Sequence, residues 1–268
     1  MKKFLLPVLL SVLSFNAVAQ DGPDEGSDGG PNDGPPRWGV GLAAILNDSP
    51  YAGEGTRVLP IPLINYNGDN FYFRGITAGW NFTRSESFEL SAITKFRFDG
   101  FSVDDLGREE LAQNGIDYQL LEDRDIALDA GLAMKWSGNA GEIEIELLQD
   151  ITDTSGGQEV SIQYGYPMRL GNGMLTLNAG ASWLSEDMAN YYYGTLDEEV
   201  ARGVINYRPD AVTIPHVGFN YFRPLGDKWS VMAVVKYSML PDEITNSPLV
   251  EFDTDSTASV LIGISRGF

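Results

Sequence analysis

Residues 87–98 read SFELSAITKFRF, and this stretch decides the fold. Apolar side chains and one threonine occupy every second position from Phe88 to Phe98, while Glu89, Lys95 and Arg97 lie among the residues between them. A period of two places these two sets on opposite faces of a β-strand. The run is longer than most strands of globular proteins, and it fits a tilted membrane-spanning strand of about 9–11 residues.

The same alternation returns along most of the chain. We expect further strands at 124–136, 141–151, 160–166, 175–183, 217–221, 229–237 and 258–268, and near the amino-terminus at 38–46, 57–66 and 70–82. Pro60 and Pro62 weaken the pattern at 57–66, because proline cannot donate to a sheet ladder. Together these segments predict an all-β protein, a transmembrane antiparallel up-and-down β-barrel.

The number of strands is limited by where the chain ends lie. Both termini of such a barrel should lie in the periplasm, which requires an even number of strands. Eleven segments are recognised, so we predict twelve strands, with ten as the alternative. The missing strand is expected within 99–123 or 185–212, unless two of the recognised segments form a single strand.

The chain begins with the features of a secretory signal. Two lysines precede an apolar run at 4–13, and the small residues at 17–19 resemble a cleavage site. The apolar run is shorter than the roughly 20 residues of a spanning helix. We expect residues 1–19 to be a signal peptide that is cleaved after Ala19.

Residues 20–36 (QDGPDEGSDGGPNDGPP) contain no aromatic or β-branched side chain. A segment so rich in Gly, Pro and Asp cannot bury a core, and it predicts a disordered acidic leader in the periplasm. The barrel domain is expected to cover residues 37–268.

The last predicted strand ends on Phe268. A strand that ends on an aromatic residue is the signal read by the barrel-assembly machinery of Gram-negative outer membranes, so we expect this machinery as a partner. Arg266 stands where that signal usually has an apolar residue. The predicted location is the outer membrane, with outer-membrane lipid and lipopolysaccharide around the barrel.

Composition excludes several classes of function. The chain has no cysteine, so it forms no disulfide and carries no lipid on a cysteine. Its formal net charge is −20, and such a surface repels nucleic acid. We therefore expect no nucleic-acid partner and attribute the acidic excess to the solubility of loops and lumen.

The connections between strands predict how the barrel is oriented. Segments 137–140, 169–173 and 224–228 are short and expected in the periplasm, while 99–123, 185–212 and 241–255 are long, acidic and expected outside. We expect the carboxylates of the outer loops to be solvated: Asp104, Asp105, Glu109, Glu110, Glu122, Asp123, Asp197, Glu198, Glu199, Asp253 and Asp255. Residues 196–202 predict one or two helical turns with Asp197 as the cap.

Charged side chains also lie on the inward faces of the predicted strands. They are Glu89, Lys95, Arg97, Asp125, Asp129, Lys135, Glu142, Glu144, Glu146 and Glu159. Because both signs occur in a narrow barrel, we predict an ion-pair network that partly or wholly plugs the lumen. A selective pore would more often display one sign.

The tryptophans give an independent signal of a membrane barrel. Trp38, Trp80, Trp136, Trp183 and Trp229 all fall at the ends of predicted strands. Indole rings prefer the level of the lipid headgroups, so we predict an aromatic girdle.

The sequence offers little catalytic chemistry. His216 is the only histidine, and no spacing ties it to Ser182, Ser230 or Ser265, the serines expected to face the lumen. We interpret His216 as a lumen side chain among polar neighbours. No phosphate loop, metal spacing or dinucleotide motif is present, so we predict no enzyme, no cofactor and no catalytic, cofactor-binding or metal-binding residue.

Five blocks of sequence resemble the MipA/OmpV family, the MltA-interacting outer-membrane proteins. They lie at 49–75, with Tyr51, Gly53, Pro62 and Tyr66; at 95–101; at 150–167; at 191–209, which begins YYYG; and at 228–251, with Leu240, Asp242, Ser247 and Pro248. Their order along residues 38–268 makes the resemblance more specific than any one block does.

The resemblance implies a non-enzymatic scaffold that brings a murein-degrading transglycosylase together with a murein synthase. Two alternatives stay open. The charged lumen would suit a small channel, and the long acidic loops that carry Tyr191 to Tyr193 would suit a surface adhesin.

Overall fold

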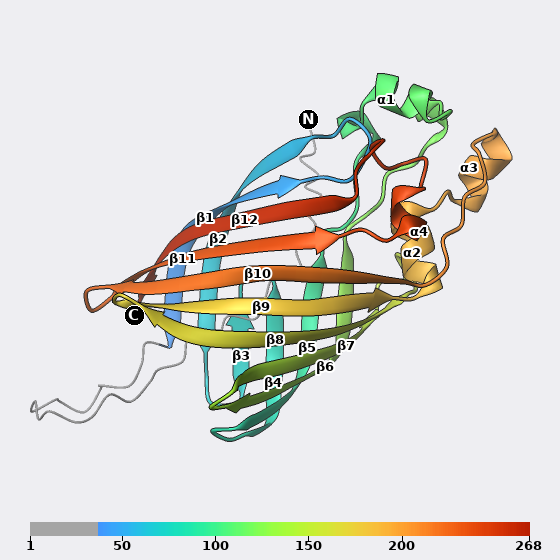
Figure 1. Cartoon of the computed structure of the whole chain (residues 1–268). Helices are drawn as coiled ribbons and strands as arrows, with labels where there is room; N and C mark the ends of the chain where they lie inside the picture. Colours follow the sequence, from blue (N-terminus) through green and yellow to red (C-terminus); the bar gives the residue numbers. More distant parts are fainter. Residues whose placement is uncertain (1–36) are drawn as a thin grey trace, which may run out of the picture.

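The computed structural model describes residues 37–268, which form one closed antiparallel β-barrel of twelve strands (Figure 1). The strands are β1 (Trp38–Asp48), β2 (Thr56–Asn67), β3 (Phe71–Arg74), β4 (Thr77–Arg84), β5 (Phe88–Arg97), β6 (Ala127–Gly138), β7 (Gly141–Asp150), β8 (Gln158–Leu170), β9 (Gly173–Leu184), β10 (Val212–Leu225), β11 (Trp229–Met239) and β12 (Ser256–Gly267). Each strand pairs with its neighbours in sequence, and β1 pairs with β12 to close the barrel. The predicted fold class is confirmed. The predicted signal peptide and leader lie outside the described residues.

Burial follows the predicted period of two. On β5, Lys95 and Arg97 are buried, whereas Phe96 between them is 46% exposed. The register with β6 preserves these faces, because Lys95 lies opposite Asp129 inside the barrel and Phe96 lies opposite Leu128 outside it. The outward faces thus form the apolar band that hydrocarbon requires.

The twelfth strand does not lie where the sequence predicted it. Segment 70–82, expected as one strand, is two strands that turn back at Gly75, whose φ is +61°. A glycine adopts this left-handed conformation without steric cost, so the short hairpin β3–β4 forms here. The segments 99–123 and 185–212, which were expected to contain the missing strand, contain no additional strand.

The long connections contain short helices instead. These are η1 (Val103–Asp105), α1 (Arg108–Gln113), η2 (Tyr118–Leu120), α2 (Glu186–Tyr193), α3 (Asp197–Arg202) and α4 (Asp242–Thr245). None of the helices in the described part of the chain has the length and apolar character needed to cross a membrane. They gather at one end of the barrel (Figure 1), and at the other end the Phe268 N–H donates to the Trp38 carbonyl at 2.9 Å.

The predicted helix at 196–202 is confirmed as α3, but its cap was predicted wrongly. Asp197 is the first helical residue, and Leu196 precedes it as the N-cap. The Leu196 N–H donates to the Glu199 carboxylate at 2.8 Å, so a side chain inside the helix satisfies the first backbone donor.

Four of the five tryptophans lie at or near strand ends, as predicted, and all five are exposed on the outside of the barrel. Trp80 is the exception, because β4 begins at Thr77 and Trp80 lies halfway along it.

Arg266, at the end of β12, packs against two aromatic rings of this girdle. Its guanidinium lies 5.0 Å from the Phe268 ring centre and 5.9 Å from that of Trp229, so the cation is stacked on aromatic faces.

Gly131 allows β6 and β7 to approach closely. A Cβ at this position would lie 1.8 Å from the Leu147 carbonyl oxygen, which belongs to the backbone of β7. A Cβ at Gly138, in the same strand, would have no other atom of residues 37–268 within 4 Å, apart from its chain neighbours.

We expect Gly131→Ala to push β6 and β7 apart and to lower the free energy of unfolding by about 1–3 kcal/mol, the usual cost of overpacking. Urea unfolding in lipid vesicles measures this loss. Gly138→Ala is the matched control and should stay near the wild-type value. Equal losses in the two variants would contradict the close approach.

Candidate functional site: the charged lumen and its extracellular lid

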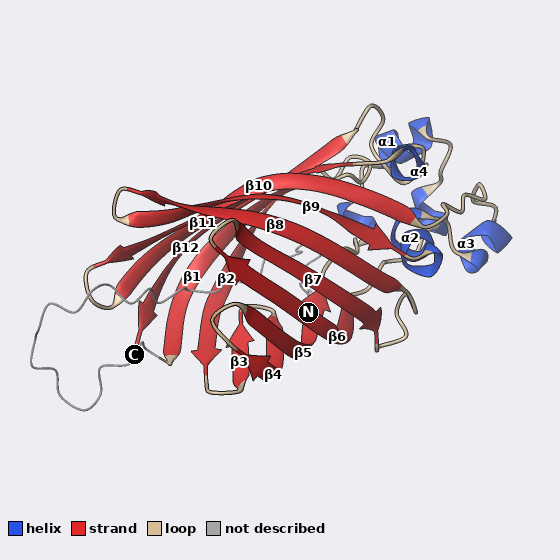
Figure 2. Ribbon diagram, turned by 60° about the horizontal axis from the view of Figure 1, so that its bottom comes forward, coloured by secondary structure: helices blue, strands red, loops and turns tan. Residues whose placement is uncertain are grey.

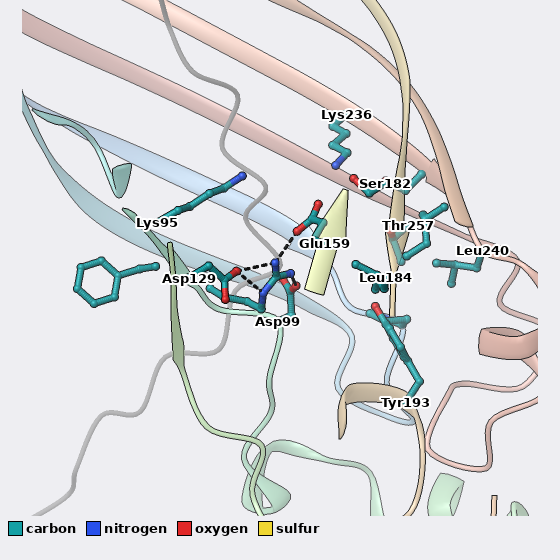
Figure 3. Close-up of a pocket in the computed structure, with 15 residues that line it drawn as sticks. Lys95, Asp99, Asp129, Glu159, Ser182, Leu184, Tyr193, Lys236, Leu240 and Thr257 are labelled. Atoms are coloured by element: carbon teal, nitrogen blue, oxygen red, sulfur yellow. Dashed lines mark hydrogen bonds and ion pairs between the residues drawn. The ribbon is translucent and has the colours of Figure 1, made fainter. Parts of the chain in front are cut away.

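Arg97, at the end of β5, gathers three carboxylates inside the barrel. Its Nε donates to Asp129 Oδ2 on β6 at 2.8 Å, and Nη1 lies 2.6 Å from Asp99 Oδ2. Nη2 also contacts the Glu159 carboxylate on β8. Figure 3 shows Asp99, Asp129 and Glu159 converging on this one guanidinium. All four groups are largely removed from solvent, so each charge depends on its partners.

Two further ion pairs lie deeper in the lumen. Lys95 Nζ is 3.0 Å from Glu146 Oε2, and Lys135 Nζ is 2.7 Å from Glu142 Oε2. Both pairs connect β7 with β5 or β6, because the inward positions of these strands are in register. The predicted network of opposite charges is confirmed. Asp125 was wrongly included, since it is exposed and precedes the first residue of β6.

A cavity of about 50 Å³ lies between this network and the opposite wall (Figure 3). Its lining includes side chains of both charge signs and a hydroxyl group: Lys95, Asp129, Glu159, Ser182 and Lys236. This volume holds a few water molecules.

His216 lies in the lumen, as predicted, and is buried on β10. Within residues 37–268 no hydrogen bond joins its ring to a serine. Ser182 lines the cavity, whereas Ser230 and Ser265 contact each other, with their Oγ atoms 2.8 Å apart. No group of three or more His, Asp or Glu side chains in this part of the chain is arranged to hold a metal ion.

Four of the extracellular connections pack into one body, which we call the lid: residues 49–55, 98–126, 185–211 and 240–255. Its core consists of buried side chains from all four segments: Tyr51, Ala52, Phe101, Leu106, Leu111, Ile116, Leu121, Met188, Ala189, Tyr192, Tyr193, Val204, Ile244, Leu249 and Val250. A cluster of this size is a second hydrophobic core outside the membrane region. The lid is thus an ordered structure and not a set of solvated loops.

A buried ion pair joins two lid segments. Arg124 Nη1 donates to Glu199 Oε1 at 2.8 Å, and Nη2 donates to Oε2 at 2.9 Å. The same guanidinium donates to the carbonyls of Tyr191, Glu122 and Gly194. Arg124 therefore uses its whole set of donors at one point of the lid.

Glu199 was wrongly predicted to be solvated, since it is fully buried. Burial opposes ionisation of this carboxyl. Hydrogen bonds from Arg124 and from the backbone N–H groups of Glu122 and Leu196 outweigh the effect of burial and lower the pKa of Glu199 from the ordinary 4.5.

No role was predicted for Arg124 from the sequence. Its position as the one cation in the acidic run EDRD at 122–125 is the signal that would have identified it.

Several residues that carry the family resemblance meet in this lid, among them Tyr51, Tyr192 and Ser247. The Tyr51 hydroxyl lies 2.9 Å from the Asp99 carbonyl oxygen and 3.2 Å from that of Tyr192, so its one proton is shared between the two acceptors. The Ser247 hydroxyl donates to the Tyr193 carbonyl at 2.6 Å. Blocks that are far apart in sequence therefore build one hydrogen-bonded unit.

Comparison with known proteins gives the family. The sequence profile described as "MltA-interacting protein MipA" matches residues 40–268. The chain belongs to the MipA family. This confirms the resemblance drawn from the five sequence blocks, and the family members named below place the barrel in the Gram-negative outer membrane.

This MipA-family chain is 32% identical over 234 residues to the MltA-interacting protein of Escherichia coli (strain K12), covering 87% of this chain and 90% of the relative. It is 31% identical over 233 residues to the putative outer membrane protein YiaT of the same strain, covering 85% and 90%. Outer membrane protein OmpV of Vibrio cholerae is 26% identical over 148 residues, covering 55% and 56%. An outer-membrane channel from Pseudomonas putida F1 aligns with a TM-score of 0.44 at 10% identity, covering 90% of this chain and all of that one.

We expect Arg97→Met to leave Asp99, Asp129 and Glu159 without their shared cation. Removing one partner of a buried pair costs about 3–5 kcal/mol, so the barrel should unfold at clearly lower urea. Arg202→Met, which breaks the exposed pair with Glu122, is the control and should change the midpoint little. A midpoint for Arg97→Met equal to the control would contradict the network.

We expect Glu199→Gln to loosen the lid while the barrel stays folded. Hydrogen exchange of residues 185–211 should become faster than in wild type, because the Arg124 charge loses its buried counterion. Glu198→Gln, at an exposed neighbouring position, is the matched control. Unchanged exchange in Glu199→Gln would show that the pair does not hold the lid.

The same pair makes the lid sensitive to acid. A carboxyl whose pKa is lowered by folding stabilises the folded state above its ordinary pKa, and this stabilisation is lost as the pH falls through the lowered value. Wild-type lid exchange should therefore rise below pH 4.5, and this pH dependence should be reduced in Glu199→Gln. An identical pH profile in both proteins would exclude Glu199 as its source.

Proposed function

We propose that this outer-membrane barrel is a non-enzymatic scaffold for enzymes that process murein. The observation that carries the proposal is its similarity to the MltA-interacting protein over 90% of that relative's length. Sequence similarity over nearly a whole chain favours a shared mode of interaction, and the names of the relatives denote membrane or interaction proteins.

The proposed partners are a murein transglycosylase and, from the family resemblance, a murein synthase. Both work on the periplasmic side, where the short turns of the barrel lie. The leader at 20–36, proposed as a periplasmic extension, would add reach toward them. Phe268 is proposed as the contact for the barrel-assembly machinery, and lipid and lipopolysaccharide as the surroundings of the outer wall.

The lumen supports this proposal better than the channel alternative. Opposite charges neutralise each other beside a cavity of about 50 Å³, and the extracellular segments form an ordered, packed body at that end of the barrel. An open pore would need a wider water-filled path.

One observation favours the adhesin alternative as a second candidate. The lid exposes two large apolar side chains, Phe252 at 78% and Ile205 at 57%. Exposed apolar side chains on an ordered surface suit contact with another macromolecule. Loss of cell binding in a Phe252→Ser, Ile205→Ser variant would support that function.

The scaffold proposal is tested by cross-linking intact envelopes and purifying the full chain. We expect a murein transglycosylase to co-purify, and its recovery to fall when residues 20–36 are deleted or when Asp227→Lys and Lys228→Glu reverse the charges of a periplasmic turn. Glu198→Lys, on the extracellular lid, is the charge-changing control and should leave recovery unchanged.

Recovery no greater than with an unrelated barrel would overturn the scaffold proposal. Single-channel recordings in planar bilayers separate the remaining alternatives. Steady conductance of the wild-type protein would favour the channel, and a flat baseline together with loss of cell binding in the lid variant would favour the adhesin.

A further inference from the structure

Strand β2 is paired along only a short part of the edge that faces β3. On the β3 side, β2 pairs only through Asn65, Tyr66 and Asn67, and β3 ends at Arg74 opposite Asn65. Among the described residues no strand pairs with the rest of that edge, from Thr56 to Leu63. Figure 2 shows how short the β3–β4 hairpin is beside the strands on either side. The extracellular half of β2 is therefore unpaired on the side of this hairpin, and we call this unpaired stretch of the wall the opening.

The two prolines of β2 lie on this open edge. The Ile64 carbonyl accepts from the Gly75 N–H at 3.2 Å, so the backbone groups of Ile64 point away from β1 and toward β3. Backbone groups two positions apart point to the same side of a strand, which places those of Pro60 and Pro62 on the open side. Proline has no N–H, so neither position leaves a donor unpaired in the membrane.

The prolines also exclude one class of occupant. An added β-strand needs the N–H donors of the edge it joins, and proline on an edge blocks such pairing. A second copy of this chain or an extended peptide is thus a poor partner for this edge. Whatever occupies the opening must make apolar contacts and not a ladder of hydrogen bonds.

The inner wall beside the opening is apolar. Leu59, Ile61 and Leu63 occupy the inward positions of β2. The register continues this surface across β1, β12, β11 and β10 with Ile45, Ala43, Leu261, Met232, Val234 and Phe222. A Cβ at Gly263 would lie 2.9 Å from Leu63 Cδ1, 3.1 Å from Ala43 Cβ and 3.3 Å from Met232 Cγ, so these side chains gather over that glycine.

The lumen therefore has two unlike sides. Strands β5 to β8 present the ion pairs, whereas β1, β2, β11 and β12 carry this aliphatic patch, which we call the apolar wall. Polar inward-facing side chains of the same strands border the patch, among them Asn47, Lys236 and Ser265. The lid packs at the extracellular end of the barrel (Figure 1). The unpaired edge of β2 directly borders the apolar wall, so the side of the barrel offers a route to this wall.

We propose that the opening beside β2 is a binding site that admits an acyl chain of an outer-leaflet lipid onto the apolar wall of the lumen. The site follows from the fold and the outer-membrane location, and it does not depend on the scaffold function. Hydrophobic contact with Leu59, Ile61 and Leu63 supplies the affinity. The absence of N–H donors at Pro60 and Pro62 keeps the edge free of strand partners.

Site-specific fluorescence in membranes tests this proposal, because the chain has no cysteine to replace. A bimane label is attached to Ile61→Cys, Val58→Cys or Leu148→Cys of the full chain, reconstituted in phosphatidylcholine vesicles that contain doxyl-labelled phosphatidylcholine. Val58 faces outward on the same edge, and Leu148 is buried and faces inward on β7, which is paired on both sides and lies outside the apolar wall. We expect quenching at Ile61 to reach at least half of that at Val58 and to exceed that at Leu148 clearly.

Quenching at Ile61 no greater than at Leu148 would overturn the proposal. Strong quenching of the Ile61 label by aqueous iodide, with none by the doxyl lipid, would also overturn it.

A second measurement needs no substitution. Wild-type protein is irradiated in vesicles of phosphatidylcholine that carries a diazirine in its acyl chain, and adducts are mapped by mass spectrometry. Adducts on Leu59, Ile61 or Leu63 are expected; adducts confined to outward-facing residues would reject the site. Neither readout involves murein enzymes, so failure here is distinct from failure of the scaffold proposal.

Discussion

Hydrocarbon offers no hydrogen-bond partner to the peptide backbone, and the rest of this structure depends on that constraint. A β-sheet meets it by closing on itself, which β1 and β12 achieve through their pairing. Closure turns the period of two in the sequence into an outside and an inside. Within residues 37–268, the outer half of β2 has an unpaired edge, and prolines at two of its positions reduce the number of donors left unpaired there.

The inside of the barrel combines two kinds of stabilisation. Ion pairs centred on Arg97 and Lys95 satisfy the charges that β5 to β8 direct inward, and each is costly to break because it is buried. The opposite wall packs aliphatic side chains over small residues such as Gly263. A lumen built this way suits a protein that binds partners or lipid better than it suits a water-filled pore.

The lid contains most of the residues that mark the family. Tyr51, Tyr192 and Ser247 come from three separate sequence blocks and meet through hydrogen bonds to backbone carbonyls. Arg124 and Glu199 join two of the lid segments through a buried pair. Ordered extracellular structure of this kind explains why long acidic connections retain recognisable blocks of sequence.

Side-chain alternation along the sequence was enough to predict an antiparallel barrel and the face on which nearly every strand residue lies, because alternation is a local property of each strand. The requirement for an even number raised the eleven recognised strands to twelve, but the sequence did not locate the twelfth. The inward-facing charges were also predicted, since the sign of a charge and its inward or outward position can both be read along the chain. The folded structure was needed to show which charges pair, that Glu199 is buried beside Arg124, and that segment 70–82 folds back at Gly75. These features depend on contacts between segments far apart in sequence. The opening beside β2 is also a feature of the folded structure, because it depends on how far the neighbouring strand β3 extends along β2.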